Sequence, residues 1–390
     1  MPRKPKYLPR FNDPSVIYEL DLPRLHALLA PHSAFLAGHG LDFGPDPERL
    51  DLAAVARVIL APHDDTPFDL ADALTHIHEM ATPEGMARLI DAAVAAGMPI
   101  DPSEKRSPAD LALQLWMEAP ELLRRQHAEH IVTKRRSLVS FMPLPDAIRL
   151  RPADLDGAIA QFESMVRAWY SGQGRGDDAT VIAFQGASEV RLVIRHGGPY
   201  QRKGCLQDDG PSTIHFRPME FAYAVLRWRT CEVAINCALK SERDMIRRAV
   251  GQCIFGQAAF FTDDRKYTLE PLRGGPASLR CVDIPGIRRV RLASLRLDKG
   301  GPQHRCDTIA ADDVFRALED DGEMIPPGSE LEAATLVFEF TDSTKPRPVT
   351  VRAGNRATYT RDGDSELVEL FLAARGFMRE GSSVAAMATA

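Results

Sequence analysis

The feature that most constrains the fold is a change of hydrophobic period at SGQGRGDD, residues 171–178. Before this segment, apolar residues recur every three to four positions, as they do on one face of a helix. After it, apolar and polar residues alternate, as they do on the two sides of a strand. The segment itself is rich in glycine and lacks apolar side chains, which is typical of a connection. We therefore expect a helical region followed by a β-rich region.

Helix-start signals support the first half of this division. Thr82–Pro83 and Ser107–Pro108 each place a capping hydroxyl before a proline in the first helical turn. Pro120 begins a further candidate helix, and the apolar residues within 153–170 recur with helical spacing. Because no sequence repeat holds over these segments, we expect a bundle of short helices.

Strand signals follow the boundary. Residues 180–185 and 189–196 alternate on either side of a short Gly-Ala-Ser link and predict a hairpin, and residues 221–229 and 232–239 predict a second. Further strands are expected at 266–272, 277–284, 287–297, 334–340 and 348–353. Helices are expected at 241–256, 311–321 and 365–376.

The order of these elements decides the fold class. Alternating strand–helix units, which mark a doubly wound parallel sheet, are missing. We therefore expect an α+β fold, with a helical N-terminal region and a mainly antiparallel β-rich region that carries a few inserted and C-terminal helices. The expected divisions are a flexible basic arm at 1–15, a helical domain at 16–172, an α+β domain at 179–378 and a frayed tail at 379–390.

Composition bounds the class of protein. With 390 residues and 44% hydrophobic content, the chain is long enough for two or three domains with cores. It has no run of about 18 apolar residues and no apolar stretch behind its basic start, so we expect neither a membrane span nor a secretory signal. The six cysteines lack zinc-ribbon spacing, which favours reduced thiols and a cytoplasmic location.

The charge of the chain is unevenly distributed. The net charge is −6, but residues 181–300 hold 20 Lys/Arg and 12 Asp/Glu, a net charge of +8. This basic middle predicts either an anionic ligand or docking against an acidic part of the same chain. In a strand at 287–297, Arg289 and Arg291 share one face, which is a plausible surface for phosphates. The full set of expected anion-binding residues is Arg195, Arg202, Arg229, Arg247, Arg289 and Arg291.

The triplet Arg195-His196-Gly197 ends an apolar strand and resembles the signature of the histidine phosphatase superfamily. The resemblance implies His196 as the nucleophile and Arg195 as a phosphate ligand. It also implies a mainly parallel sheet and a second histidine from a later strand end. Downstream, only His215 and His304 remain. The alternative, which the missing βαβ pattern favours, is a β-hairpin whose turn uses glycine and proline for backbone reasons.

Two histidine-bearing helices offer a metal-binding alternative. His76 and Glu79 are three residues apart in one candidate helix, and His127 and His130 are three apart in another. Side chains at this spacing share a helix face and can bind a metal together. The other interpretation is that these groups are solvated or capping, in which case the chain holds no metal.

Three functions remain open on this evidence. The sequence has no phosphate-binding P-loop, no GxGxxG after a strand, no GxSxG and no HEXXH, and we expect no cofactor. We favour a binding or regulatory protein whose basic β-rich region holds an anionic ligand, nucleic acid among the candidates, and whose helical region contacts a protein partner. The alternatives are an enzyme acting on a phosphorylated substrate through His196, and a structural subunit of a larger assembly.

Overall fold

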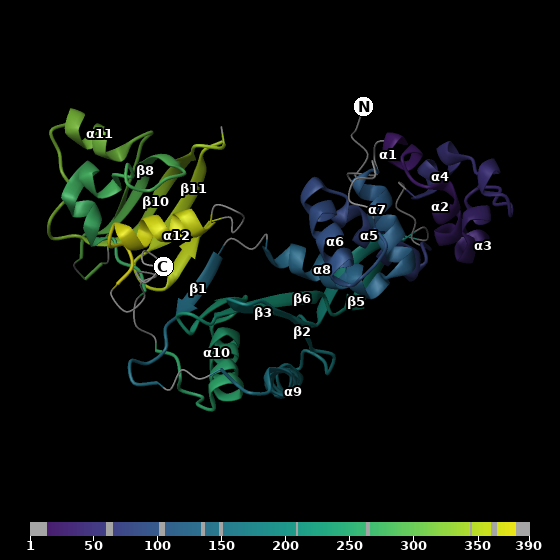
Figure 1. Ribbon diagram of the computed structural model, residues 1–390, viewed down its shortest axis with the longest axis horizontal. Helices are drawn as coiled ribbons and strands as arrows, with labels where there is room; N and C mark the ends of the chain where they lie inside the picture. The colour runs from purple at the N-terminus through teal and green to yellow at the C-terminus, as the bar shows by residue number, and fades with distance from the viewer. Residues whose placement is uncertain are drawn as a thin grey trace. The chain divides into compact units, whose positions relative to one another are not determined.

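The computed structural model describes residues 14–59, 65–100, 106–133, 137–147, 151–207, 210–262, 266–300, 302–303, 305–343, 345–359 and 365–379. These residues form two compact units, 1–131 and 132–390, each considered by itself (Figure 1). Of the expected basic arm at 1–15 only residues 14 and 15 are described, and of the expected tail only residue 379. The rest of both segments lies outside the described residues.

The first unit is helical, as its sequence pattern predicts. Its helices are α1 (Pro14–Tyr18), α2 (Leu22–Leu29), η1 (Ala30–His32), α3 (Ser33–Gly38), η2 (Pro47–Arg49), α4 (Leu52–Ile59), α5 (Phe68–Met80), α6 (Pro83–Ala95), α7 (Pro108–Glu118) and α8 (Pro120–Thr133). The predicted caps of α6 and α7 are confirmed, since Thr82 and Ser107 accept from backbone N–H groups of their helices. The apolar stripes of these helices meet in one core.

The second unit is built on a ten-stranded antiparallel sheet, which confirms the α+β class with a mainly antiparallel sheet. Its order is β2-β3-β6-β7-β1-β12-β11-β10-β8-β9. The strands are β1 (Ser137–Phe141), β2 (Thr180–Gln185), β3 (Glu189–Gly197), β6 (Met219–Arg227), β7 (Glu232–Asn236), β8 (Ile287–Asp298), β9 (Cys306–Ala310), β10 (Glu330–Phe340), β11 (Arg347–Arg352) and β12 (Arg356–Thr358). The two predicted hairpins are present as β2–β3 and β6–β7.

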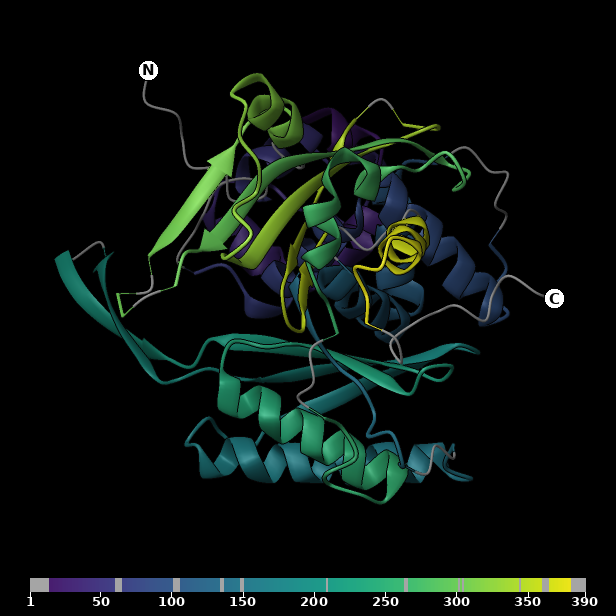
Figure 2. The ribbon, with the colours of Figure 1, turned by 90° about the vertical axis from the view of Figure 1, so that its left-hand side faces the viewer.

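Two helices cover one face of the first half of this sheet. Helices α9 (Leu155–Gly172) and α10 (Lys240–Phe255) lie side by side against it (Figure 2). Alternate residues of β3, namely Leu192, Ile194 and His196, point toward these helices because side chains on a strand alternate between its faces. The triplet histidine therefore lies on the buried side of the strand.

The second half of the sheet has its own core and corrects two predicted strands. Strands β8, β10 and β11 pack against α12 (Ser365–Ala374) and the 3₁₀ segment η3 (Glu270–Leu279), with α11 (Val314–Asp320) beside them. The strands expected at 266–272 and 277–284 are wrong, because η3 occupies this stretch. The physical reason is that Pro271 and Gly274-Gly275-Pro276 break a strand ladder and favour tight turns.

The observed division of the chain differs from the expected one. The first unit ends at residue 131, and the segment expected to close the helical domain contributes β1 and α9 to the second unit. An apolar stripe such as that of α9 shows that one helix face is buried, but it does not show which neighbour buries it.

A separate two-stranded hairpin leaves the sheet between β3 and β6. It consists of β4 (Gln201–Gln207) and β5 (Gly210–Phe216), which among the described residues pair with each other and with no strand of the large sheet. Figure 2 shows it projecting at the left of the view, away from α9 and α10. We call β4 and β5 the arm, a name that from here on refers only to this hairpin and not to the N-terminal segment 1–15. No helix among the described residues is long and apolar enough to cross a membrane.

Candidate anion-binding site on the arm

The arm begins at a bend that requires glycine. Gly197 ends β3, and a Cβ atom there would overlap the carbonyl oxygen of Arg175. A Cβ on Gly198 would lie 2.6 Å from Glu220 Oε1 and 2.8 Å from Pro218 Cγ. The Gly198 N–H donates to the Pro218 carbonyl at 2.7 Å, which holds the two chains together across the bend. The Gly-Gly-Pro sequence thus serves the backbone, as expected, but it is not the turn of a hairpin, because β3 pairs with β6 up to Gly197 and the chain then continues into β4, which pairs with β5.

The register of the arm places two cations and two aromatic rings on one face. Arg202 lies opposite His215, and Gln201 lies opposite Phe216. Since side chains alternate along each strand, Tyr200 and Arg217 continue the face of Arg202 and His215. We call these four residues the arm platform. Lys203 and Phe216 lie on the opposite face of the arm.

Contacts within the platform link its rings to its cations. The Tyr200 and His215 rings are stacked with centroids 5.9 Å apart, and the Arg217 guanidinium lies 5.6 Å from the Tyr200 centroid. Arg217 also donates to the Gly174 carbonyl, which ties the base of the arm to the glycine-rich segment before β2. On the other face, Lys203 Nζ lies 5.6 Å from the Phe216 centroid.

The arm has no core of its own. None of its described residues is buried or belongs to a hydrophobic core, and Leu206 is 82% exposed. An isolated two-stranded hairpin is marginally stable in water, and both faces of this one meet solvent.

Three of the six predicted anion-binding arginines remain available to a ligand. Arg195, Arg202 and Arg229 are exposed and form no ion pair with a described carboxylate. Arg195 is on β3 at the base of the arm and Arg202 is on the arm itself. Arg229 follows the far end of β6, so it does not join them.

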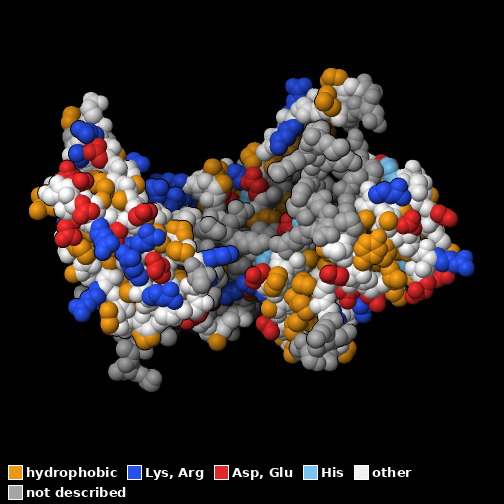
Figure 3. Space-filling model, turned by 90° about the horizontal axis from the view of Figure 1, so that it is seen from above, with side chains coloured by type: hydrophobic (Ala, Val, Ile, Leu, Met, Phe, Trp, Pro, Cys, Tyr) orange, Lys and Arg blue, Asp and Glu red, His pale blue; other side chains and the backbone are white. Residues whose placement is uncertain are grey.

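The other three predicted arginines have acidic neighbours. Arg289 binds Asp313 at 3.1 Å, and Arg291 lies 3.7 Å from Glu339 and donates to the Asp312 carbonyl. These two arginines share one face of β8, as predicted. Basic and acidic side chains are intermixed over this part of the chain, at the left of Figure 3. Arg247 stands over the Phe141 ring at 4.9 Å, with Asp244 at 3.8 Å.

His196 lies in a buried polar network. It is 4% exposed, its ring stacks on Tyr170 with centroids 4.0 Å apart, and its Nε2 lies 3.2 Å from Glu242 Oε1. Tyr170 donates to the same oxygen. Burial would raise the pKa of Glu242, but the hydrogen bonds from His196 and Tyr170 lower it. A phosphoryl acceptor must meet solvent, and this imidazole packs under the sheet instead. His215 is on β5, and His304 lies outside the described residues.

The predicted metal ligands are only partly brought together. His127 Nε2 lies 2.6 Å from Glu79 Oε2, and the His76 and His127 rings are 4.4 Å apart. Burial and the neighbouring His76 lower the pKa of His127, although Glu79 opposes the shift. His76 Nδ1 contacts the Asp72 carbonyl at 2.8 Å, so this nitrogen is engaged within its own helix. Among the described residues, these side chains do not place three donor atoms within 4.8 Å of one another.

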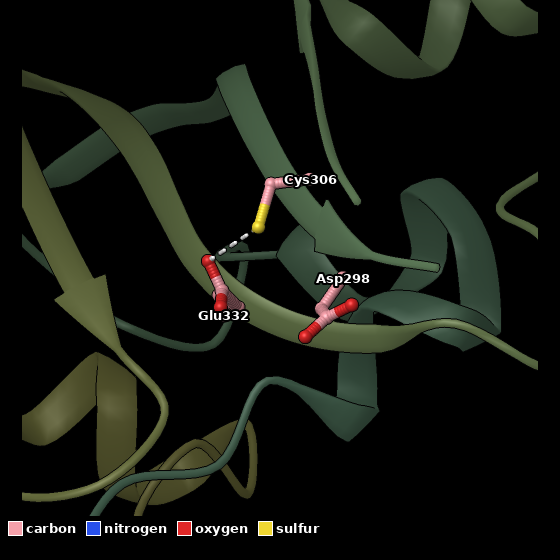
Figure 4. Close-up of side chains that lie close together, drawn as sticks. All are labelled: Asp298, Cys306 and Glu332. Carbon is pink, nitrogen blue, oxygen red and sulfur yellow. Dashed lines mark hydrogen bonds between the residues drawn. The ribbon is translucent and has the colours of Figure 1, made fainter. Parts of the chain in front are cut away.

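Another group meets that distance criterion. Asp298, Cys306 and Glu332 have donor atoms within 4.8 Å of one another on neighbouring strands β8, β9 and β10 (Figure 4). Cys306 Sγ lies 3.7 Å from Glu332 Oε2, and the same oxygen accepts from Arg296 at 2.6 Å. Since an arginine already neutralises Glu332, a cation would have to displace it.

A buried ionic cluster marks the middle of the sheet. Lys266 and Glu232 are each 2% exposed, and Lys266 Nζ lies 2.7 and 2.8 Å from the two carboxylate oxygens of Glu232. Arg227 bridges Glu232 at 3.7 Å to Glu369 at 2.8 Å. Burial would raise the pKa of Glu232, but Lys266 and Arg227 lower it to about 2. Lys266 and Arg227 are therefore paired with carboxylates inside the fold and are not available to a ligand.

Comparison with known proteins assigns no family to the chain, so the site is interpreted from its geometry and chemistry alone. No protein-family model matches the chain, and no curated protein matches it. Sequence reasoning missed the platform as a unit, because it considered Arg217 only as a further phosphate ligand of the phosphatase alternative and did not include Tyr200 or His215 among the expected anion-binding residues. The signal that would have found it is the two-residue spacing of Tyr200–Arg202 and of His215–Arg217 on either side of the sequence Asp208-Asp209-Gly210, whose residue types favour a turn.

Proposed function

We propose that the protein binds an anionic polymer through the arm, and that this polymer is nucleic acid. The observation that carries the proposal is the exposure of Arg195, Arg202 and Lys203 at the arm, without an ion pair to a described carboxylate. Cations that retain their hydration and lack an acidic partner are the ones that neutralise phosphates.

The local charge supports the same ligand class. Residues 195–220 hold four Lys/Arg against three acidic residues, of which Asp208 and Asp209 are adjacent in the sequence and Glu220 lies 3.8 Å from Arg175. The basic residues lie in the half of the arm nearest the sheet and on the segments that lead into it. We therefore place the phosphate contacts at the base of the arm, where Arg195 and Arg217 flank Arg202 and Lys203.

A matched pair of double variants tests the proposal. R202Q/K203Q removes two cations from the arm, and R289Q/R291Q removes two paired cations from β8. We expect the arm variant to bind labelled oligonucleotides about 100-fold more weakly or worse, because each of the two charge-assisted contacts contributes about 1.5–3 kcal/mol. The β8 variant should bind like the wild type. Equal losses in both variants, or no binding by the wild type, would contradict the proposal.

The protein partner expected for the helical region stays a prediction. So do the cytoplasmic location and the alternative of a structural subunit. Burial of His196 does not favour the phosphatase alternative.

A further inference from the structure

We infer that the nucleic acid bound by the arm is single-stranded, with one base stacked against the Tyr200–His215 pair; this rests on the function proposed above. Tyr200 is 61% exposed although its ring already stacks on His215 at an interplanar angle of 27°. Two neighbouring aromatic rings in solvent, inclined to each other by 27°, offer a surface that a third ring can extend. Base–aromatic stacking of this kind is typical of single-strand binders.

Cations stand where the flanking phosphates would lie. Arg217 is 5.6 Å from the Tyr200 centroid, and Arg202 is the cross-strand neighbour of His215. A base on the aromatic pair therefore has one guanidinium on β4 and another directly after β5 within reach of its backbone. The combination of a stacking surface and a positive track is what a single strand requires.

The second face of the arm repeats this pairing of cation and ring. Lys203 Nζ lies 5.6 Å from the Phe216 centroid, and Lys203 itself is exposed. A flexible single strand can follow both faces of a narrow ribbon, whereas the bases of a duplex are already stacked on one another. An exposed ring therefore gains most from an unpaired base.

The experiment compares three polymers with the full-length protein: a labelled oligothymidylate, a duplex of the same length, and heparin as a polyanion without bases. Tyr200→Ala removes the ring and Tyr200→Phe retains it. Tyr18→Ala is the matched control, because Tyr18 is an exposed tyrosine of the helical unit, 57% exposed. Unchanged heparin binding by Tyr200→Ala shows that the arm still presents its cations.

We expect Tyr200→Ala to bind oligothymidylate about 5- to 150-fold more weakly, the equivalent of about 1–3 kcal/mol for one stacked base. Tyr200→Phe and Tyr18→Ala should bind like the wild type, and the duplex should bind more weakly than the single strand. As a second measurement, Tyr200→Trp should give a fluorescence that oligothymidylate quenches and heparin does not.

The outcomes separate this inference from the function on which it rests. If Tyr200→Ala binds oligothymidylate as well as the wild type does, while R202Q/K203Q does not, the single-strand inference is wrong and the anionic-polymer proposal stands. Tighter binding of the duplex than of the single strand would also overturn the inference. If the wild type binds none of the three polymers, both are wrong.

Discussion

Strands β4 and β8 both carry arginines, yet their surroundings differ. On β8, Arg289 faces Asp313 and Arg291 faces Glu339. On β4, Arg202 is exposed and meets no described carboxylate. The comparison teaches that a run of cations in a sequence defines a binding surface only when the neighbouring strands and loops leave it unpaired.

The buried ionic cluster around Lys266 and Glu232 is a third environment for cations, in which they are both buried and paired. Its disruption has the largest expected effect on stability. Lys266→Met leaves Glu232 buried with only the more distant Arg227 to balance it. We expect a loss of about 3–5 kcal/mol in the free energy of unfolding, because a buried charge loses its partner. Denaturant titration measures this loss, and Lys203→Met on the arm is the control that should unfold at the wild-type midpoint. An unchanged midpoint for Lys266→Met would show that its charge is not needed by the fold.

The second prediction concerns His196, the nucleophile that the resemblance to histidine phosphatases would imply. His196→Ala removes a ring that packs on Tyr170 and a hydrogen-bond partner of the buried Glu242. We expect a cost of about 1–3 kcal/mol in thermal or denaturant unfolding. His215→Ala, an exposed histidine of the arm, should cost nothing measurable.

The same variant tests the enzyme alternative. Hydrolysis of a generic phosphate ester should be absent or equal in the wild type and His196→Ala. Hydrolysis that is present in the wild type and lost in a folded His196→Ala protein would restore the phosphatase interpretation.

The third prediction is a pH dependence of stability. The ordinary pKa of a glutamate is 4.5 and that of Glu232 is about 2 in the folded protein, so its stabilising contribution is complete above about pH 4.5. It is lost as the pH falls from 4.5 toward 2, since the unfolded chain takes up the proton first. Glu242 and Glu369, whose pKa values are also lowered, act in the same direction.

Melting temperatures measured between pH 7 and pH 2 test this dependence. Glu232→Gln should lose less stability over the acidic part of the range than the wild type does. Parallel acid profiles for the two proteins would mean that Glu232 is not the group responsible.

The smallest expected effect is on the β8 face. Arg289→Gln breaks an exposed ion pair, and such pairs contribute no more than about 1 kcal/mol. Differential scanning calorimetry should place its melting temperature close to that of the wild type. A large drop would show that the β8 ion pairs stabilise the sheet more than their exposure suggests.

Local sequence patterns predicted much of the architecture. Alternation gave β3, β8, β10 and β11, because each of these strands buries one face. It failed over residues 266–284, where a short alternation coincides with prolines and paired glycines that fold as η3. It also missed β1, whose five residues are too few to show a period.

The candidate site was harder to predict because partners come from distant segments. Nothing near Arg289 in sequence shows that Asp313 will neutralise it, and nothing near Arg291 points to Glu339. The burial of His196, by contrast, could be predicted locally. Leu192, Ile194 and His196 are two residues apart along one strand, so their side chains share a face. The face shared by Arg202 and His215 depends on a hairpin register that follows only from the turn.

The salt dependence of oligonucleotide binding measures whether the exposed cations of the arm make the phosphate contacts. Each phosphate contact on a single strand contributes about 0.7 to the slope of log K against log salt concentration. R202Q/K203Q should reduce the magnitude of the wild-type slope by about 1.4, and R289Q/R291Q should leave it unchanged. The account is contradicted if R289Q/R291Q reduces the slope as much as R202Q/K203Q does, or if the wild type shows no salt dependence.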